Sequence, residues 1–493
     1  MKRIVLLAAG LVFVFHGVSL RADSSNPQTA DEIERRIERV VNGLLPSGVF
    51  KNQSRYGPKT TLKERMAHYH TPGVSIAVVN NYKIEWARGF GVREHGKREP
   101  VTENTLFQAA SISKPMFALA VMRLVEDGKL NLDEDVNRYL TSWKVPPNGS
   151  WQPRITLRQI LSHSAGLTVH GFPGYRTTEK LPSLIDILNG SAPANTPRIE
   201  VNILPGLQAR YSGGGTTLAG QAVVDVLGKP FAQIMREVLL DPVGMKHSTF
   251  DQPLPAKWAK SAATAHPSKN QPLPGKWHVY PELAPDGLWT TPSDLARAGI
   301  ELQLALKGEA KSLLSAPTAM EMLTPVIETV GIGFMLDGKD KSIRFGHGGA
   351  NEGFLSQMTM YKELGMGAVV MINSGEGGPM LREIERAIAR EYDWPDSLTE
   401  DKKPVQLAAE VLQTFVGEYA GASGFKCAIT RHGDKLFLKF GTQSPLELYP
   451  ESGTKFFATA LNAEVTFDRK EDGETKGLSL QQDNKSFSAE RKP

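Results

Sequence analysis

The sequence predicts an α+β protein with a second, smaller antiparallel β domain at its C-terminal end. Extended runs occur at GVSIAVVNNYKIEWARGFGVRE and return at RFGHGG and GAVVMINS, with helical stretches between them. Strands at both ends of such a segment indicate one domain whose sheet is completed by distant parts of the chain. From about residue 405 the pattern changes to short alternating runs, among them KCAITR, KLFLKF and AEVTFDRK. This change is typical of a small antiparallel barrel or sandwich.

The first residues have the layout of a secretory signal. Two basic residues precede an apolar run from Ile4 to about Leu20, and Ala22 offers a cleavage point. We therefore predict that residues 1–22 are a signal peptide and that the protein is exported, either periplasmic or secreted. The alternative is an N-terminal membrane anchor, because the apolar run is close to spanning length. No later stretch is apolar enough to span, so we expect no stable membrane span after signal removal.

Composition and charge argue against several classes of partner. With 493 residues, of which 40% are hydrophobic and 22% charged, the chain is long enough for more than one domain. The formal net charge of +4 falls to +1 when the three basic residues of the predicted signal are removed. A nearly neutral chain offers no basic surface to nucleic acid or anionic lipid, so we expect neither partner. The single cysteine, Cys427, excludes an intramolecular disulfide, and its alternation with Ile429 predicts packing in a strand.

Two domains are expected after the signal. The first begins with an amphipathic helix from about Asp31. The apolar stripe of this helix is formed by Ile33, Ile37, Val40, Val41 and Leu44. A β-hairpin follows, with its strands joined at Asn80-Asn81, because asparagine tolerates positive φ. The polar stretch DWPDSLTEDKKPVQ separates this domain, placed at residues 30–395, from a second at 405–493.

The stretch FQAASISKPMFALAV holds Ser111 and Lys114, three residues apart. Apolar residues downstream follow helical spacing, and Gly128 can end the helix. Pro115 is tolerated only in a first turn, which places the helix start near Ser111 to Ser113. Ser111 therefore lies where unpaired backbone N–H groups and the helix dipole stabilise developing negative charge. Lys114, one turn on, points to the same face and can reach the serine oxygen.

The Ser-x-x-Lys motif is weak when taken alone. A serine hydroxyl becomes a good nucleophile when a nearby base takes its proton, and a partly buried lysine can do that. The alternative for this helix is a capping serine followed by a solvated lysine, which is a common arrangement. A second match, Ser452 to Lys455, lies in a predicted turn of the C-terminal domain. The weight of the motif therefore depends on the rest of the chain.

Two further segments strengthen the catalytic interpretation. The stretch ARYSGGGTTLAGQAVVDVLG places Tyr211 just before a glycine run and a helix with one apolar face. The stretch RFGHGGANEGFLSQM places His347 at a strand edge, followed by Gly348 and Gly349. Glycines at both places let a backbone approach another group closely. Taken singly, Tyr211 is better explained as a core aromatic residue and His347 as a surface residue at a strand end.

Together the three segments resemble the serine β-lactamase and penicillin-binding-protein superfamily, in particular its class C and esterase-like branch. The superfamily order of Ser-x-x-Lys, Tyr-x-Asn and Lys/His-x-Gly is followed by residues 111–114, 211–213 and 347–349. The stretches TPGVSIAVV, ITLRQILSHSAGL, LLDPVGMKHSTF and LAPDGLWTTPSDLARAG also look like the family. The resemblance covers about residues 30–395 and implies an antiparallel sheet flanked by helices, with a mainly helical subdomain. The C-terminal domain resembles the small lipocalin-like barrel often appended to such hydrolases.

The resemblance implies a role for each matched residue. Ser111 would attack a carbonyl carbon and become acylated, while Lys114 and Tyr211 would share the proton transfers, either of them being the acylation base. The backbone N–H groups of Ser111 and Ala350 would form the oxyanion hole. The substrate-binding positions would be His347, Gly349 and Gly213. Water would then release the acyl group, and no metal or organic cofactor is required.

Two departures from the family pattern bear on the substrate. Gly213 stands where the family has an asparagine whose amide binds the acyl-amide group of penicillin-like substrates. His347 stands where β-lactamases usually have a lysine that fixes the substrate carboxylate, and histidine is mostly neutral at pH 7. We therefore expect cleavage of an ester or amide (peptide) bond in a small-molecule or peptide substrate. Esterase or D-amino-acid-type peptidase activity is favoured over β-lactamase or DD-carboxypeptidase activity.

The sequence argues against two other classes of hydrolase and leaves a binding protein open. The His-x-His pair of His68 and His70 has no further ligands nearby, which argues against a metal hydrolase. The chain has no Gly-x-Ser-x-Gly match, which argues against the nucleophile elbow of the other common serine-hydrolase fold. The family resemblance suggests that His163, in LSHSAGL, anchors a helix–loop junction and is not catalytic. A catalytically silent, exported binding protein with the same fold stays open, although the combined serine, lysine and tyrosine argue against it.

Overall fold

The computed structural model describes residues 27–45, 60–309, 313–395, 404–421, 426–441, 445–458, 463–470, 472–482 and 485–492. The predicted signal peptide, and with it the alternative of an N-terminal anchor, lies outside these residues. Among the helices that the structure describes, none is both long and apolar enough to cross a membrane.

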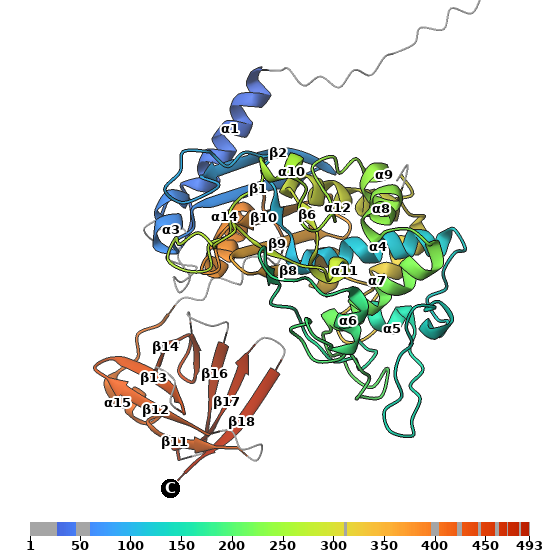
Figure 1. Cartoon of the computed structure of the whole chain (residues 1–493). Coiled ribbons are helices and arrows are strands. Elements are labelled where there is room, and N and C mark those ends of the chain that lie inside the picture. The colour runs from blue at the N-terminus through green and yellow to red at the C-terminus, as the bar shows by residue number, and fades with distance from the viewer. Residues whose placement is uncertain are drawn as a thin grey trace, which may run out of the picture.

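The larger domain is built on an antiparallel sheet with the strand order β2-β1-β10-β9-β8-β7. Figure 1 labels the first five of these strands. Its strands are β1 (Gly73–Asn80), β2 (Lys83–Gly91), β7 (Met335–Asp337), β8 (Arg344–Asn351), β9 (Phe354–Tyr361) and β10 (Gly367–Ile372). β1, from the start of the domain, pairs directly with β10, from its far end. The prediction that distant parts of the chain complete one sheet is therefore confirmed.

Both faces of this sheet are covered by helices. Val74, Ile76 and Val78 of β1 pack into one core, and Ala77 and Val79 pack into the other. Successive residues of a strand point to opposite sides, so the alternation separates the two cores. The helices on the first face are α1 (Pro27–Val41), α3 (Leu62–His68) and α14 (Gly378–Glu391). The second face is covered by α12 (Pro292–Leu306).

The β1–β2 hairpin is present, but its turn lies one residue further along than predicted. Asn80 pairs with Lys83, which leaves Asn81 and Tyr82 as the two turn residues. Their φ values are 51° and 59°. A two-residue hairpin loop with two positive φ values is the type I′ turn, whose twist matches the strands. The first helix also begins earlier than expected, at Pro27 instead of about Asp31.

A mainly helical subdomain packs beside α12. Its central helix, α4 (Ser113–Glu126), follows the 3₁₀ turn η1 (Ala110–Ile112), and Pro115 lies in its first turn as predicted. The other helices are α5 (Leu157–Leu161), α6 (Leu184–Asn189), α7 (Gly213–Leu227), α8 (Phe231–Met235), α9 (Asp241–Val243), α10 (Ala256–Ala259), α11 (Leu283–Asp286) and α13 (Ala316–Met322). The short strands β3 (Phe107–Gln108) and β6 (Trp289–Thr290) pair beside η1, and β4 (Tyr175–Arg176) pairs with β5 (His278–Val279).

The C-terminal domain is a closed antiparallel barrel, so of the two predicted forms the barrel is the correct one. Its strands run in chain order from β11 to β18, and β18 pairs back with β11. They are β11 (Gly417–Ala420), β12 (Lys426–His432), β13 (Lys435–Phe440), β14 (Leu446–Pro450), β15 (Lys455–Ala458), β16 (Ala463–Arg469), β17 (Thr475–Gln482) and β18 (Lys485–Arg491). A short helix, α15 (Ala409–Gln413), precedes them. Cys427 is buried in β12, as predicted, and burial raises the pKa of its thiol to about 11.

Candidate active site

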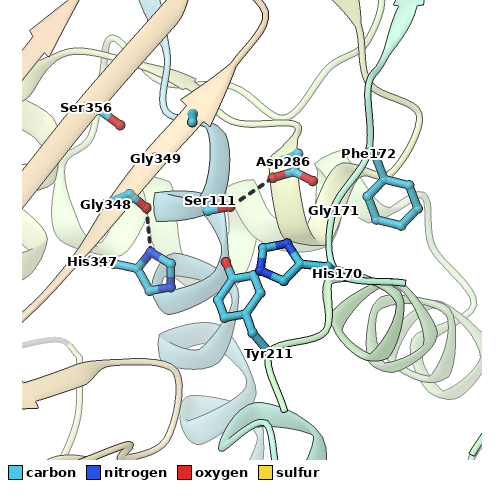
Figure 2. Close-up of a pocket in the computed structure, with 11 residues that line it drawn as sticks. Ser111, His170, Gly171, Phe172, Tyr211, Asp286, His347, Gly348, Gly349 and Ser356 are labelled. Atoms are coloured by element: carbon cyan, nitrogen blue, oxygen red, sulfur yellow. Dashed lines mark hydrogen bonds between the residues drawn. The ribbon is translucent and has the colours of Figure 1, made fainter. Parts of the chain in front are cut away.

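Segments that are far apart in the sequence line one pocket of about 790 Å³. The lining residues are Ser111, His170, Gly171, Phe172, Tyr211, Asp286, His347, Gly348, Gly349, Ala350 and Ser356 (Figure 2). Ser111, Tyr211, His347, Gly349 and Ala350 were all predicted from the sequence as site residues. Two other predicted residues do not line the pocket, because Lys114 is buried behind Ser111 and Gly213 packs against a loop.

Ser111 lies in η1, immediately before α4. The residue before it, Ala110, has φ of 51°, in the left-handed region that residues with a Cβ adopt rarely. Ser113 fixes this turn, because its Oγ donates to the carbonyl oxygen of Ala110 (2.6 Å) and accepts from the N–H of Leu288 (3.1 Å). Uncommon backbone conformations persist where the surrounding structure holds them in this way. The second serine of the SISK stretch therefore positions the first.

Lys114 is buried and fully hydrogen-bonded. Its side chain is 3% exposed. Nζ donates to Ser111 Oγ (2.8 Å), to the carbonyl oxygen of Pro285 (3.2 Å) and to Asp286 Oδ1 (3.4 Å). An ammonium group has three N–H donors and no acceptor, so these three acceptors match it completely.

Asp286 is a site residue that the sequence analysis did not identify. It ends α11, and its Oδ1 accepts a hydrogen bond from the Ser111 hydroxyl (3.3 Å). Asn351 Nδ2 donates to the Asp286 carbonyl oxygen (3.3 Å) and to Gln108 Oε1 (3.0 Å), which ties α11 to β8 and β3. One signal was available in the stretch LAPDGLW: an acidic residue among apolar ones is rarely buried unless it is paired.

Tyr211 is surrounded by histidine rings. Its ring centroid lies 4.3 Å from that of His163, 4.8 Å from that of His170 and 5.9 Å from that of His347. Lys114 Nζ lies 5.1 Å from the same centroid, over the ring. Figure 2 shows the Tyr211 ring between His170 and His347, with its hydroxyl end towards Ser111. In the part of the chain that the structure describes, the Tyr211 hydroxyl has no hydrogen-bond partner.

His163 supports Tyr211 from the protein interior. It is buried, and its Nδ1 accepts a hydrogen bond from the N–H of Ser212 (3.2 Å). This bond assigns the ring proton to Nε2, because a neutral imidazole has one donor and one acceptor nitrogen. Burial, followed by the charge of Lys114, lowers the pKa of His163 well below its usual range. His163 therefore stays neutral and anchors the segment that leads from Tyr211 into α7.

His347 lies within β8, and its ring is nearly buried. Its Nδ1 lies 2.6 Å from the carbonyl oxygen of Gly348, which assigns the ring proton to Nδ1. Nε2 is then an acceptor, and it has no hydrogen-bond partner among the described residues. Burial, followed by the charge of Lys114, lowers the pKa of His347 to about 4. His347 therefore carries no positive charge at neutral pH.

Gly213 lies in a tight space beside the loop of residues 170–172. A Cβ at residue 213 would lie 3.1 Å from the carbonyl oxygen of His170 and 3.1 Å from the Phe172 ring. The N–H of Gly213 also donates to the His170 carbonyl oxygen (3.0 Å). The loop of residues 170–172 thus occupies the space beside residue 213. Neither His170 nor Phe172 was predicted from the sequence as a site residue, although both line the pocket.

The two predicted oxyanion-hole residues come from neighbouring segments. β8 packs along η1, so the backbone of Gly349 and Ala350 lies beside the backbone that carries Ser111. Ser356, which pairs with Gly349 from the neighbouring strand β9, donates from its Oγ to the carbonyl oxygen of Ala109 (3.0 Å). The N–H groups of Ser111 and Ala350 remain the predicted oxyanion donors.

The His-x-His pair does not lie on a strand. His68 is the last residue of α3, and His70 Nδ1 lies 3.1 Å from a carboxylate oxygen of Glu376. Within the described ranges, no group of three or more histidine, cysteine, aspartate or glutamate side chains is arranged to hold a metal ion.

Comparison with known proteins places this geometry in a family. The family model described as Beta-lactamase matches residues 59–392. The chain belongs to the Beta-lactamase family. Members of this family are serine hydrolases, so the resemblance seen in the three sequence motifs is confirmed. A second family model matches residues 401–491, which include the barrel. It is described as a domain of unknown function (DUF3471).

Relatives and solved structures agree on the fold of this Beta-lactamase family member. "Penicillin-binding protein 4*" of Bacillus subtilis (strain 168) is 25% identical over 461 residues, which cover 87% of this chain and 97% of that protein. The octameric penicillin-binding protein homologue from Pyrococcus abyssi superposes with a TM-score of 0.59 at 22% identity, covering 87% of this chain and 98% of that one. The D-amino acid amidase from Ochrobactrum anthropi SV3 gives a TM-score of 0.56 at 21% identity, covering 73% and 99%.

Proposed function

We propose that this protein is an exported serine hydrolase that cleaves an ester or amide (peptide) bond through an acyl-enzyme on Ser111. Esterase or D-amino-acid-type peptidase activity is the favoured form. One observation carries the proposal: the Ser111 hydroxyl lines the pocket between Lys114 Nζ at 2.8 Å and Asp286 Oδ1 at 3.3 Å. A nucleophilic serine needs a neighbouring acceptor for its proton and a fixed position, and this arrangement supplies both.

The chemistry follows from the groups around the serine. Ser111 Oγ attacks the substrate carbonyl carbon, and the N–H groups of Ser111 and Ala350 stabilise the resulting oxyanion. The buried Lys114 ammonium offsets the negative charge that develops on Oγ during the attack. Tyr211, with its hydroxyl end towards Ser111 (Figure 2), is placed to exchange a proton with the leaving group. Water then attacks the acyl carbon and releases the acid.

The charge of the pocket supports a substrate that has no obligatory carboxylate. The lining residues include no lysine or arginine, and the pKa of His347, lowered to about 4, keeps that ring neutral. The charged side chain in the lining is that of Asp286. The lining therefore offers no cation to attract a substrate carboxylate, and the Asp286 carboxylate would repel it. β-Lactams and DD-peptides carry a free carboxylate, which this pocket does not favour. We therefore rank β-lactamase or DD-carboxypeptidase activity second.

The position of Gly213 supports the same ranking. With the loop of residues 170–172 beside it, this position presents no amide to the acyl-amide group of a penicillin. His170 and Phe172 line the pocket in its place and offer one aromatic ring and one imidazole ring. These rings suit an apolar or aromatic acyl group.

A panel of substrates tests the proposal on purified residues 23–493. The panel holds p-nitrophenyl butyrate, the amides of D- and L-phenylalanine, nitrocefin, benzylpenicillin and a D-alanyl-D-alanine peptide, with Ser111→Ala as the control. We expect kcat/KM for the ester or the D-amide to exceed that for every β-lactam by at least about 100-fold. A preference for nitrocefin, benzylpenicillin or the DD-peptide would reverse the ranking. Absence of turnover on all six compounds would favour the silent binding protein.

A further inference from the structure

We propose that Asp286 is the general base that takes the Ser111 proton during acylation. This inference rests on the proposed function, because it assigns a role in acyl transfer by Ser111. It adds a third group to the two, Lys114 and Tyr211, that the family resemblance implies.

The hydrogen bonds around Ser111 carry the argument. Ser111 Oγ receives a hydrogen bond from Lys114 Nζ at 2.8 Å and donates its own proton to Asp286 Oδ1 at 3.3 Å. Lys114 Nζ also contacts the carbonyl oxygen of Pro285 at 3.2 Å and Asp286 Oδ1 at 3.4 Å, so towards Ser111 it is placed as a hydrogen-bond donor. Among the described residues, Asp286 is the one acceptor recorded for the Ser111 hydroxyl.

The other candidate bases near the pocket are not engaged with Ser111. The Tyr211 hydroxyl has no hydrogen-bond partner in the described part of the chain. His163 uses Nδ1 to accept from the N–H of Ser212, and His347 uses Nδ1 to donate to the carbonyl oxygen of Gly348. A base must come within hydrogen-bond reach of the proton that it removes, and catalytic hydrogen bonds are often longer when no substrate is bound. At 3.3 Å from Ser111 Oγ, the Asp286 carboxylate is close enough to meet this condition with a small adjustment.

The buried charges around Asp286 favour the same assignment. The Asp286 side chain is 5% exposed, and its Oδ2 has no hydrogen-bond partner within the described residues. Glu282, four residues earlier, is buried, and burial raises the pKa of its carboxyl group to about 8, with a smaller contribution from Asp286. Glu282 is therefore mostly protonated at pH 7, and the neighbouring Tyr280 is neutral. Lys114 Nζ and Asp286 Oδ1 form a buried ion pair 3.4 Å apart, and Ser111 Oγ is hydrogen-bonded to both of these atoms.

In this reaction Asp286 holds the proton that Ser111 loses. The bond from Ser111 Oγ to the carbonyl carbon forms, the hydroxyl proton moves to Asp286 Oδ1, and the carbonyl π electrons move to oxygen. When the intermediate collapses, the bond to the leaving group breaks, the leaving group takes a proton from the Tyr211 hydroxyl, and the proton held on Asp286 returns to Tyr211. In deacylation, water forms a bond to the acyl carbon and gives a proton to Asp286. The bond to Ser111 Oγ then breaks, and the serine oxygen takes that proton back.

Asp286→Asn tests the assignment, because the amide keeps the shape and one acceptor oxygen but is a far weaker base. The measured quantity is the rate constant for p-nitrophenol release in the first turnover with p-nitrophenyl butyrate at pH 7, together with the intact mass of the acyl-enzyme. This ester has a good leaving group, so its acylation rate reports on removal of the serine proton. We expect Asp286→Asn to lower this rate constant at least about 100-fold, the usual contribution of a general base.

Glu282→Gln is the matched control, since it replaces a buried carboxyl group that is mostly neutral at pH 7 and does not contact Ser111. Its acylation rate should stay within about threefold of the wild-type rate. If Lys114 were the base, removal of the Asp286 carboxylate would favour the neutral amine. An Asp286→Asn rate equal to or above the wild-type rate would therefore overturn the proposal.

A measurement on the wild-type protein covers the case in which Asp286→Asn does not fold. A carboxylate base is already ionised at pH 6, whereas an amine base gains activity as the pH rises towards 10. We expect the acylation rate constant to change by less than threefold between pH 6 and 8. A tenfold or larger rise over that range would overturn the assignment. A wild-type protein that forms no acyl-enzyme at all would instead overturn the proposed function, and the role of Asp286 with it.

Discussion

Gly349 lies directly against the carbonyl oxygen of Ala109, so closely that a Cβ at residue 349 would be 2.2 Å from that oxygen. The same Cβ would lie 2.3 Å from Ser356 Oγ. The contact joins β8 to the backbone that leads into Ser111. The close approach of β8 to the Ser111 segment therefore depends on residue 349 being a glycine.

Gly349→Ala is expected to lower acylation by p-nitrophenyl butyrate at least about 100-fold, because β8 must move away from Ala109 and carry Ala350 with it. The neighbouring variant Gly348→Ala is the matched control. A Cβ there would meet the flexible end of Gln357 at 3.3 Å, which can move aside. Single-turnover rates and thermal unfolding of both variants check the prediction. Equal effects of the two substitutions would contradict it.

Gly213→Asn restores the family residue, but we expect no gain in penicillin hydrolysis. The new side chain would collide with the carbonyl oxygen of His170 and the ring of Phe172, each 3.1 Å from the Cβ position. Overpacking of this kind costs about 1–3 kcal/mol of stability. Gly171→Asn is the control, since a Cβ at that position has no neighbour within 4 Å. Urea unfolding and benzylpenicillin turnover are the measurements. A stable Gly213→Asn variant that hydrolyses penicillin would show that the loop does not block this position.

His347 is expected to make the folded protein less stable in mild acid. Its pKa is lowered to about 4 in the folded state, against an ordinary value of about 6.5. As the pH falls from 6.5 towards 4, the unfolded chain binds a proton that the folded chain does not, so the free energy of unfolding falls. The loss is on the order of 3 kcal/mol for this residue. The lowered pKa of His163 acts in the same direction.

Urea midpoints of the wild type and His347→Gln at pH 7.0, 5.5 and 4.5 test this prediction. The urea midpoint of the wild type should fall between pH 7.0 and 4.5, and that of His347→Gln should fall less. A substitution at the exposed His432 should leave the decline unchanged. If the urea midpoints of the wild type and His347→Gln fall equally with pH, the His347 ring protonates in the folded state as freely as in the unfolded chain.

Glu282→Gln is expected to stabilise the protein progressively as the pH rises. The Glu282 carboxyl has a pKa raised to about 8, whereas an unfolded chain ionises glutamate near pH 4.5. Between these values the folded state retains a proton that the unfolded state has lost, so wild-type stability falls with rising pH by up to about 1.4 kcal/mol per pH unit. Glutamine has no such proton. The difference in melting temperature between variant and wild type should grow from pH 5 to pH 8, and a constant difference would contradict the raised pKa.

The sequence was sufficient for the part of the site that local constraints determine. Pro115 fixes the start of α4, which in turn places Ser111 and Lys114 on neighbouring turns. The order of the three motifs was enough to identify the family, and alternating runs were enough for the C-terminal barrel. These features depend on spacing within short segments, which a single sequence displays directly.

Asp286 could not be predicted in the same way. Its partners Ser111 and Lys114 lie far away in the sequence, and only the packing of α11 against α4 brings the three together. The β1–β2 turn was misplaced for a similar reason. Tyr82 adopts a positive φ that asparagine accepts more readily, and tertiary contacts hold it there: its N–H donates to Gly365, and its hydroxyl donates to the carbonyl oxygen of Glu363.

The central claim, an acyl-enzyme on Ser111, is tested most directly by intact mass spectrometry of residues 23–493 after short incubation with p-nitrophenyl butyrate. The wild type should gain one butyryl group at low pH quench, and the adduct should clear with time as water releases the acid. Ser111→Ala should gain none under the same conditions, while its circular dichroism spectrum matches that of the wild type. A butyryl adduct that persists in Ser111→Ala, or that maps to another residue in the wild type, would contradict the assignment of the nucleophile.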